Sequence, residues 1–278
     1  MDWQQGFFPT RSGDLYFQRW RKGSGPLVLA LHGWLDNSAS FRLLAEQLPQ
    51  FDVIALDLPG HGRSSHDPRG FYHLWEYLPA LIEVVESFGQ PIHLWGHSMG
   101  GMVAPLLALA EPERIQSLVL IDSLGGPPYG SKDLLQWLSQ CRQKPRPHLP
   151  YDSFADMVAV RMRGMTPLSE QAASLLCAHQ ADQQADGRWL WTFDPAIKLG
   201  SPVRLRDDDY HLVLNQLPMP SLVILAEQGW VQQFLDVEQR LSWLNQNTRV
   251  EWVPGGHHCH LELEELPHCL QTIRDFYE

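Results

Sequence analysis

Short aliphatic stretches alternate with helical patterns through the first 123 residues of this chain. Four stretches are apolar on both faces of a strand: 27–31 (LVLAL), 52–56 (DVIAL), 91–95 (PIHLW) and 117–121 (SLVLI). Helical spacing fills the intervals at 38–48, 75–88 and 99–110. Strands of this kind, separated by helices, are typical of a parallel sheet that helices cover on both sides. The pattern therefore predicts an α/β fold with a mostly parallel central sheet.

The alternation stops between residues 124 and 217. Three helical patterns, at 132–143, 153–163 and 169–184, and one strand-like stretch, 188–193 (RWLWTF), take its place. The sheet pattern then returns with a strand at 221–226, a helix at 231–245, a strand at 249–253 and a closing helix at 260–277. We predict a core domain of residues 1–123 and 218–278, interrupted by a mostly helical cap at 124–217.

The segment Gly96-His97-Ser98-Met99-Gly100 fits the pattern Gly-x-Ser-x-Gly, directly after a predicted strand and directly before a predicted helix. A sharp strand-to-helix turn lifts the serine hydroxyl clear of the sheet, and side chains at 96 and 100 would collide with neighbouring backbone. The alternative is a glycine-rich turn without chemistry. The strand–turn–helix context favours Ser98 as a nucleophile at a helix N-terminus.

A serine hydroxyl needs a base, and His257 is the best candidate because it follows the last predicted strand behind two glycines. His258 and His260 are its local rivals. A tetrahedral intermediate also needs two N–H donors. We expect these from the backbone of Met99, after the nucleophile, and of Trp34, in the loop after the first strand. The ring of Trp34 would line the pocket, although an ordinary core position is the alternative.

Four segments, 32–34 (HGW), 57–64 (DLPGHGRS), 96–101 (GHSMGG) and 256–257 (GH), together resemble the successive signatures of the α/β-hydrolase superfamily. With 191–195 (WTFDP) and 226–230 (AEQGW), the chain further resembles the serine hydrolase-like group. The resemblance implies an α/β-hydrolase fold with helices on both faces of the sheet and an inserted helical cap. It also implies that Ser98 forms an acyl-enzyme.

One position departs from the pattern of many relatives, which carry the acid of the catalytic triad after the strand at 221–226. That position is Gly229 here. In some relatives the acid follows the strand nearer the nucleophile, and the matching residue is Asp122. We therefore predict Asp122 as the acid, with Glu227 as its rival. An aspartate that merely caps a turn, leaving no working acid, is the other alternative.

The cap is expected to cover the pocket, and we place Trp34, His97 and Trp191 at the substrate-binding site. Five cap aromatics favour an apolar substrate group, unless they form the cap's own small core: Trp137, Tyr151, Phe154, Trp189 and Trp191. We predict hydrolysis of a carboxylic ester, or a related acyl bond, of a small apolar substrate. A C–C bond hydrolase with the same triad and a non-catalytic ligand-binding homologue are the alternatives.

The composition of the chain argues against several classes of binding partner. A formal net charge of −11 repels phosphate backbones and anionic lipid, so we expect neither nucleic acid nor membrane as a partner. Cys259 lies in the cluster GGHHCH, but no second cluster at metal-ligand spacing accompanies it, so we expect no metal and no organic cofactor. The first 20 residues lack a signal-peptide pattern and no apolar run approaches ~18 residues, so the expected location is the cytoplasm.

Overall fold

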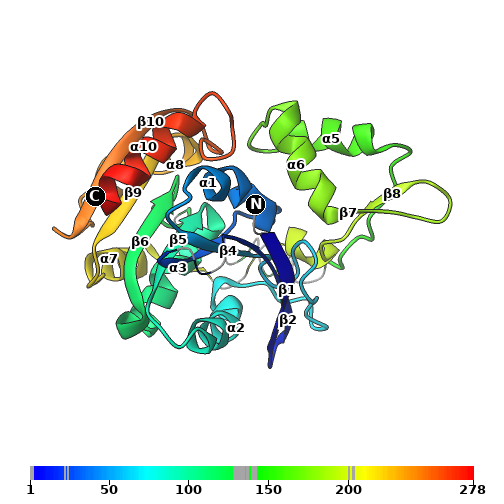
Figure 1. Cartoon of the computed structure of the whole chain (residues 1–278). Helices are drawn as coiled ribbons and strands as arrows, with labels where there is room; N and C mark the ends of the chain where they lie inside the picture. The colour runs from blue at the N-terminus through cyan, green and yellow to red at the C-terminus, as the bar shows by residue number, and fades with distance from the viewer. Residues whose placement is uncertain are drawn as a thin grey trace.

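The computed structural model describes residues 3–21, 23, 25–127, 135, 138, 143–199, 201 and 204–278. Eight strands form one sheet in the order β1-β2-β4-β3-β5-β6-β9-β10 (Figure 1). Their bounds are β1 Trp3–Thr10, β2 Gly13–Trp20, β3 Leu27–Leu31, β4 Asp52–Leu56, β5 Ile92–His97, β6 Ile115–Ile121, β9 Ser221–Gln228 and β10 Thr248–Gly256. All neighbouring strands from β4 to β10 pair in parallel, which confirms the predicted mostly parallel sheet.

Strands β1 and β2 form an antiparallel hairpin at one edge of the sheet, where β2 also pairs antiparallel with β4. The sequence analysis did not predict this hairpin. Residues of β1 alternate between exposed and partly buried, because β1 is the outermost strand. Such a strand lacks the continuous apolar run by which the central strands were found.

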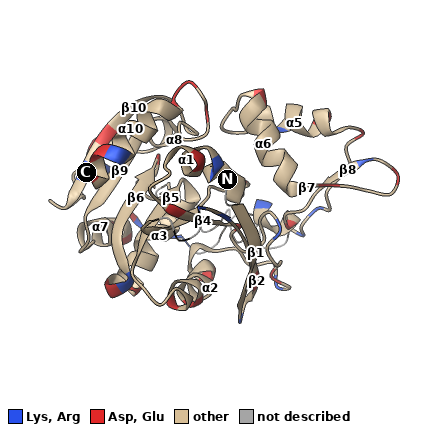
Figure 2. Cartoon of the chain, viewed as in Figure 1, with Lys and Arg blue, Asp and Glu red and all other residues tan. Residues whose placement is uncertain are grey.

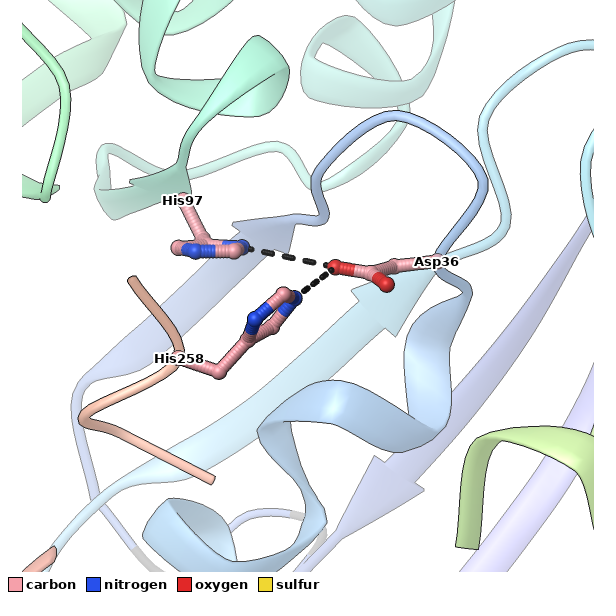
Figure 3. A group of neighbouring side chains, drawn as sticks. All are labelled: Asp36, His97 and His258. Carbon is pink, nitrogen blue, oxygen red and sulfur yellow. Dashed lines mark hydrogen bonds and ion pairs between the residues drawn. The ribbon is translucent and has the colours of Figure 1, made fainter. Parts of the chain in front are cut away.

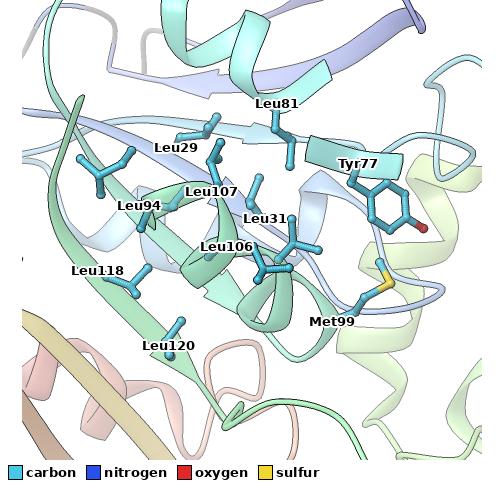
Figure 4. Close-up of a cluster of buried hydrophobic side chains, with 14 of the residues drawn as sticks. Leu29, Leu31, Tyr77, Leu81, Leu94, Met99, Leu106, Leu107, Leu118 and Leu120 are labelled. Atoms are coloured by element: carbon cyan, nitrogen blue, oxygen red, sulfur yellow. The ribbon is translucent and has the colours of Figure 1, made fainter. Parts of the chain in front are cut away.

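Helices cover both faces of the sheet (Figure 1). On one face lie α2 (Leu74–Ser87), α3 (Met99–Ala110) and α7 (Asp207–Asn215); on the other lie α1 (Arg42–Gln47) and α10 (Leu266–Tyr277). Successive residues of a central strand pack alternately against the helices on one face of the sheet and those on the other. Leu29 and Leu31 of β3 pack with Leu81 and Leu107 on the α2–α3 side (Figure 4). Their neighbour Val28 packs on the α1–α10 side.

Three predicted helices end or begin elsewhere in the structure. The helix expected at 231–245 is two short ones, α8 (Trp230–Phe234) and α9 (Val237–Leu241), because Asp236 is extended and its carboxylate accepts from the Gln239 N–H to cap α9. The helix expected from 260 begins at Leu266, with Pro267 in its first turn. The helix expected at 38–48 starts as a 3-10 turn, η1 (Ser38–Phe41), ahead of α1.

The insertion contains α5 (Phe154–Met162), α6 (Glu170–Gln180), the hairpin β7 (Ala181–Gln183) and β8 (Trp189–Trp191), and the 3-10 turn η3 (Pro195–Lys198). These elements lie beside the sheet rather than on its faces (Figure 1). The helix expected at 169–184 ends at Gln180, where pairing of β7 with β8 begins. The helix expected at 132–143 and Trp137 fall almost wholly outside the described residues.

Helix α7 was assigned to the insertion, but it packs with the core. Its residues Tyr210 and Leu214, with Leu205 and Leu217 beside it, belong to the same buried cluster as α2 and α3. By packing, α7 belongs with the core layer, and the boundary at 217 stays a prediction.

The segment after β4 ties the insertion to the core. The buried carboxylate of Asp57 lies 2.7 Å from Nε2 of His179 on α6 and accepts the backbone N–H groups of Ser38 and Arg63. The carbonyl of Gly62 accepts the Thr192 hydroxyl at 2.6 Å. The motif at 57–64 thus anchors the insertion. In the described part of the chain, no helix is both long and apolar enough to cross a membrane.

Candidate active site

Ser98 stands at the sharp turn between β5 and α3. Its φ of 51° lies in the left-handed region, which side chains rarely adopt, so the turn is held against local strain. A Cβ at Gly96 would come within 2.6 Å of the Gly100 carbonyl oxygen, and one at Gly100 would run into the backbone of Leu31 and His32. Glycine is therefore required at both positions, as the sequence predicted.

The ends of three strands bring Ser98, His257 and Asp122 together. Nε2 of His257 lies 2.8 Å from the Ser98 hydroxyl, and Nδ1 of His257 lies 2.5 Å from Oδ2 of Asp122. Because the carboxylate can only accept, Nδ1 carries the proton and Nε2 presents its lone pair to the hydroxyl. This is the arrangement that lets an imidazole remove the serine proton.

The carboxylate of Asp122 is fully buried and firmly held. Its oxygens accept the backbone N–H groups of Trp230 at 2.7 Å and Ala226 at 3.3 Å, in addition to the His257 bond. The rival Glu227 is exposed at the end of β9 and has no hydrogen bond to His257. Of the two candidate acids, the structure brings only Asp122 to the histidine.

His257 is almost fully buried, and burial lowers its pKa below the ordinary value of 6.5, although the hydrogen bond to Asp122 opposes the shift. The imidazole is therefore neutral at pH 7, as a general base must be. Neither His258 nor His260 forms a hydrogen bond with the Ser98 hydroxyl, which pairs with His257. His258 instead lies 3.1 Å from Asp36, and the ring of His260 packs against those of Phe41 and His97.

The two expected N–H donors border the nucleophile. Met99 is the first residue of α3, so its N–H has no acceptor within the helix. Trp34 lies in the loop after β3, where the left-handed φ of Leu35, 62°, turns the chain. The Trp34 side chain is 40% exposed and donates from Nε1 to the Ile197 carbonyl at 3.1 Å, so it is not a core residue. Donation to an oxyanion by Met99 and Trp34 stays a prediction.

A cavity of about 550 Å³ opens above Ser98 between the core and the insertion. Ser98, Met99, His257, Trp34 and Trp191 line it. Most of the remaining lining is apolar or aromatic, including Tyr72, Leu74, Tyr77, Met102, Tyr151, Val160, Met165, Phe193, Ile197 and Trp230. Phe154 and Trp189 do not line it and pack against each other, with ring centroids 5.2 Å apart. The cap aromatics thus divide between pocket and cap interior.

His97, which we placed at the substrate-binding site, is fully buried and does not line this cavity. As the last residue of β5 it points away from Ser98 toward the α1–α10 layer. Its Nε2–H donates to the His257 carbonyl at 2.9 Å. The placement was wrong because a side chain next to a nucleophile in sequence projects to the opposite side of the strand.

Sequence analysis missed Asp36, which Figure 3 shows beside His97 and His258 and which also binds Arg161. This carboxylate is 1% exposed. Its Oδ2 lies 3.1 Å from Nε2 of His258 and 3.6 Å from Nδ1 of His97, while Oδ1 accepts from the guanidinium of Arg161 on α5 at 2.5 Å. Burial opposes ionisation of Asp36, but His258 and Arg161 hold its pKa well below the ordinary value. No motif signals this residue, because its partners are remote in sequence.

Asp36, His97 and His258 also offer three potential metal-ligand atoms within 4.8 Å of one another. Arg161 already neutralises the carboxylate, so a divalent ion here would leave excess positive charge buried. The donor set fits a buried ion pair flanked by two imidazoles better than a metal centre.

Comparisons with known proteins agree with this geometry. Residues 26–263 match the family model described as alpha/beta hydrolase fold. A "Serine hydrolase-like protein" from Danio rerio is 33% identical over 97% of this chain and 87% of its own length. The crystal structure of a hypothetical protein from Pseudomonas aeruginosa PAO1 superimposes with a TM-score of 0.88 at 32% identity, covering 98% of this chain and 99% of that one.

A more local match is the "Pimeloyl-[acyl-carrier protein] methyl ester esterase" of Aeromonas salmonicida, 40% identical over 104 residues, which are 37% of this chain and 40% of the relative. The family model and the zebrafish relative each span most of the chain. Together with the sheet order and the turn at Ser98, they show that the chain belongs to the α/β-hydrolase family, as a member of its serine hydrolase-like group.

Proposed function

We propose that this α/β-hydrolase cleaves a carboxylic ester, or a related acyl bond, of a small and largely apolar substrate through an acyl-enzyme at Ser98. The observation that carries the proposal is the unbroken series of contacts from the Ser98 hydroxyl to His257 and on to Asp122, at 2.8 and 2.5 Å. The series ends at the floor of the cavity, where a carbonyl group could meet the hydroxyl.

The reaction follows from the tautomer of His257. As Ser98 attacks the carbonyl carbon, Nε2 takes the hydroxyl proton, and Asp122 stabilises the imidazolium that forms. The negative charge on the carbonyl oxygen would face the backbone N–H groups of Met99, at the start of α3, and of Trp34, in the loop after β3. His257 then returns its proton to the departing alcohol. In the second half-reaction it activates water against the acyl-enzyme.

Relatives give the bond type some support. Besides the serine hydrolase-like proteins, the local match in Aeromonas salmonicida bears the name of a methyl ester esterase. The lining of the cavity is mainly apolar, which suits an acyl or aromatic group. We place Trp34 and Trp191 against that group.

The test is titration with a fluorophosphonate, combined with turnover of p-nitrophenyl esters of increasing acyl length. We expect stoichiometric labelling at Ser98 and hydrolysis of at least one ester, both lost in Ser98→Ala. A folded wild-type protein that neither reacts with the fluorophosphonate nor turns over any ester would instead support a ligand-binding homologue without catalysis.

A further inference from the structure

Positively charged side chains outnumber negatively charged ones in the lining of the cavity. Apart from the histidines, the charged lining residues are Asp36, Arg161, Lys198 and Arg204. Asp36 and Arg161 neutralise each other through their ion pair. Within the described ranges, no carboxylate lies at ion-pair distance from Lys198 or Arg204. Among the described residues, these two positive charges at the cavity therefore have no carboxylate counterion.

The excess of positive charge at the cavity is opposite in sign to the formal net charge of the whole chain, which is −11. Asp and Glu residues are spread over helices and loops of the chain (Figure 2). Some exposed cations pair with these carboxylates, as Arg63 does with Asp182 and Arg69 does with Glu76. Lys198 and Arg204 have no such partner in the described part of the chain; both are exposed to solvent and line the cavity, where an anionic group of a bound molecule could reach them.

Both cations belong to one stretch of chain that leaves the insertion for α7. Five residues of this stretch line the cavity: Ile197, Lys198, Leu199, Ser201 and Arg204. Its beginning is fixed against the core, because the Ile197 carbonyl accepts the Trp34 side chain at 3.1 Å. The Lys198 ammonium lies 5.2 Å from the centroid of the Phe193 ring, another lining residue. Lys198 thus lies beside an anchored residue, next to the loop that supplies Trp34.

Lys198 is also partly desolvated, and this burial lowers its pKa from the ordinary value of 10.5. An anion placed beside the ammonium would offset the cost of its desolvation. Arg204 complements Lys198, because a guanidinium stays charged and can bind a carboxylate or phosphate through two N–H groups.

We propose that the substrate carries an anionic group, a carboxylate or a phosphate, which Lys198 and Arg204 bind while the apolar part lies among the aromatic residues over Ser98. This inference rests on the proposed ester hydrolysis and specifies its substrate class as amphiphilic. The anion can come from either side of the scissile bond: a carboxylate at the far end of the acyl group, or a phosphate on the leaving group.

Two matched pairs of substrates separate these sources. For the acyl side, p-nitrophenyl hydrogen adipate is compared with its neutral methyl ester. For the leaving-group side, hexanoyl-coenzyme A is compared with the hexanoyl thioester of N-acetylcysteamine, which lacks the phosphates. We expect kcat/KM of the charged member to exceed that of its neutral partner about tenfold in one pair, as one charge-assisted contact allows. The preference should shrink as salt is added.

Charge-reversal variants test whether Lys198 and Arg204 cause the preference for the charged substrate. Lys198→Glu and Arg204→Glu should each bring the charged-to-neutral ratio of kcat/KM to 1 or below. Arg188→Glu makes the same change in charge on an exposed cap residue outside the cavity, and should leave the ratio unaltered. The ratio cancels any general loss of active protein, which fluorophosphonate labelling of Ser98 measures separately.

The possible failures are distinct. If the wild type labels at Ser98 and hydrolyses both members of each pair equally, the anionic subsite is wrong and the esterase proposal stands. A charge preference that survives both reversals also overturns the assignment to Lys198 and Arg204. If the protein neither labels nor hydrolyses any member, the proposed function fails, and the inference that depends on it fails as well.

Discussion

The carboxylate of Asp122 fills the space that a side chain at Gly229 would need. A Cβ built on Gly229 would overlap both carboxylate oxygens of Asp122. The next residue, Trp230, donates its backbone N–H to the same carboxylate at 2.7 Å. The ends of β6 and β9 thus offer one place for an acid beside His257, and here the residue from β6 occupies it. This explains why the acid position used by many relatives holds glycine in this chain.

The first prediction concerns the identity of the acid. Asp122→Asn keeps the shape but removes the charge, and should lower kcat for an accepted ester by roughly 10³–10⁴, the scale known for the acid of a serine protease triad. Glu227→Gln is the matched control and should stay close to wild type, because Glu227 is exposed and makes no hydrogen bond to the histidine. Equal losses in the two variants would refute the assignment.

The shared space makes a second prediction possible. Gly229→Asp alone should unfold at a lower temperature than wild type, because two carboxylates would compete for one buried site. Asp122→Ala combined with Gly229→Asp frees that site and should recover activity well above the level of Asp122→Ala alone. Thermal unfolding and ester turnover of the three variants test this. No recovery in the double variant would show that an acid from β9 cannot reach His257 here.

A third prediction follows from the lowered pKa of His257. The base must be neutral, so kcat/KM should fall at acidic pH with a midpoint below 6.5. The negative charge of Asp36 raises the pKa of His257, so Asp36→Asn should move this midpoint to still lower pH. Asp208→Asn, at an exposed position on α7, is the control and should not shift it. An upward shift in Asp36→Asn would contradict the expected sign.

The fourth prediction concerns stability. Burial lowers the pKa of both His61 and His258 to about 3, so each stays neutral in the folded protein while its unfolded counterpart binds a proton near pH 6.5. The contribution of these two histidines to the stability of the folded state is complete above pH 6.5 and is lost as the pH falls toward 3. Each should contribute a slope of about 1.4 kcal/mol per pH unit to the free energy of unfolding in this window.

Urea unfolding of wild type and His61→Asn between pH 7 and 4 measures how the free energy of unfolding changes with pH. The slope of the variant should be smaller than that of wild type by the contribution of His61, about 1.4 kcal/mol per pH unit. His268→Gln, which replaces an exposed histidine on α10, is the matched control variant. Identical slopes in wild type and His61→Asn would show that His61 is not held neutral by the fold.

The features predicted well from the sequence are those with a local cause. The central strands were found because they are buried on both faces, and the turn at Ser98 because glycine is sterically required at 96 and 100. The edge strand β1 was missed because its burial is partial, and the break before α9 because it depends on a single cap at Asp236. Asp36 and the cations of the cavity wall could not be found. Their significance arises from contacts between segments more than 100 residues apart, such as that of Asp36 with Arg161.

The bond between Asp36 and Arg161 limits how freely the cap can be exchanged. The insertion enters and leaves the chain between the sheet strands β6 and β9, so it could be taken for an exchangeable module. A chimera whose new cap lacks a cation at the place of Arg161 would leave Asp36 uncompensated, at a cost of about 3–5 kcal/mol for a buried pair that loses one partner. Engineers who graft caps onto this core would therefore need to transfer that one arginine with them, or remove Asp36 as well.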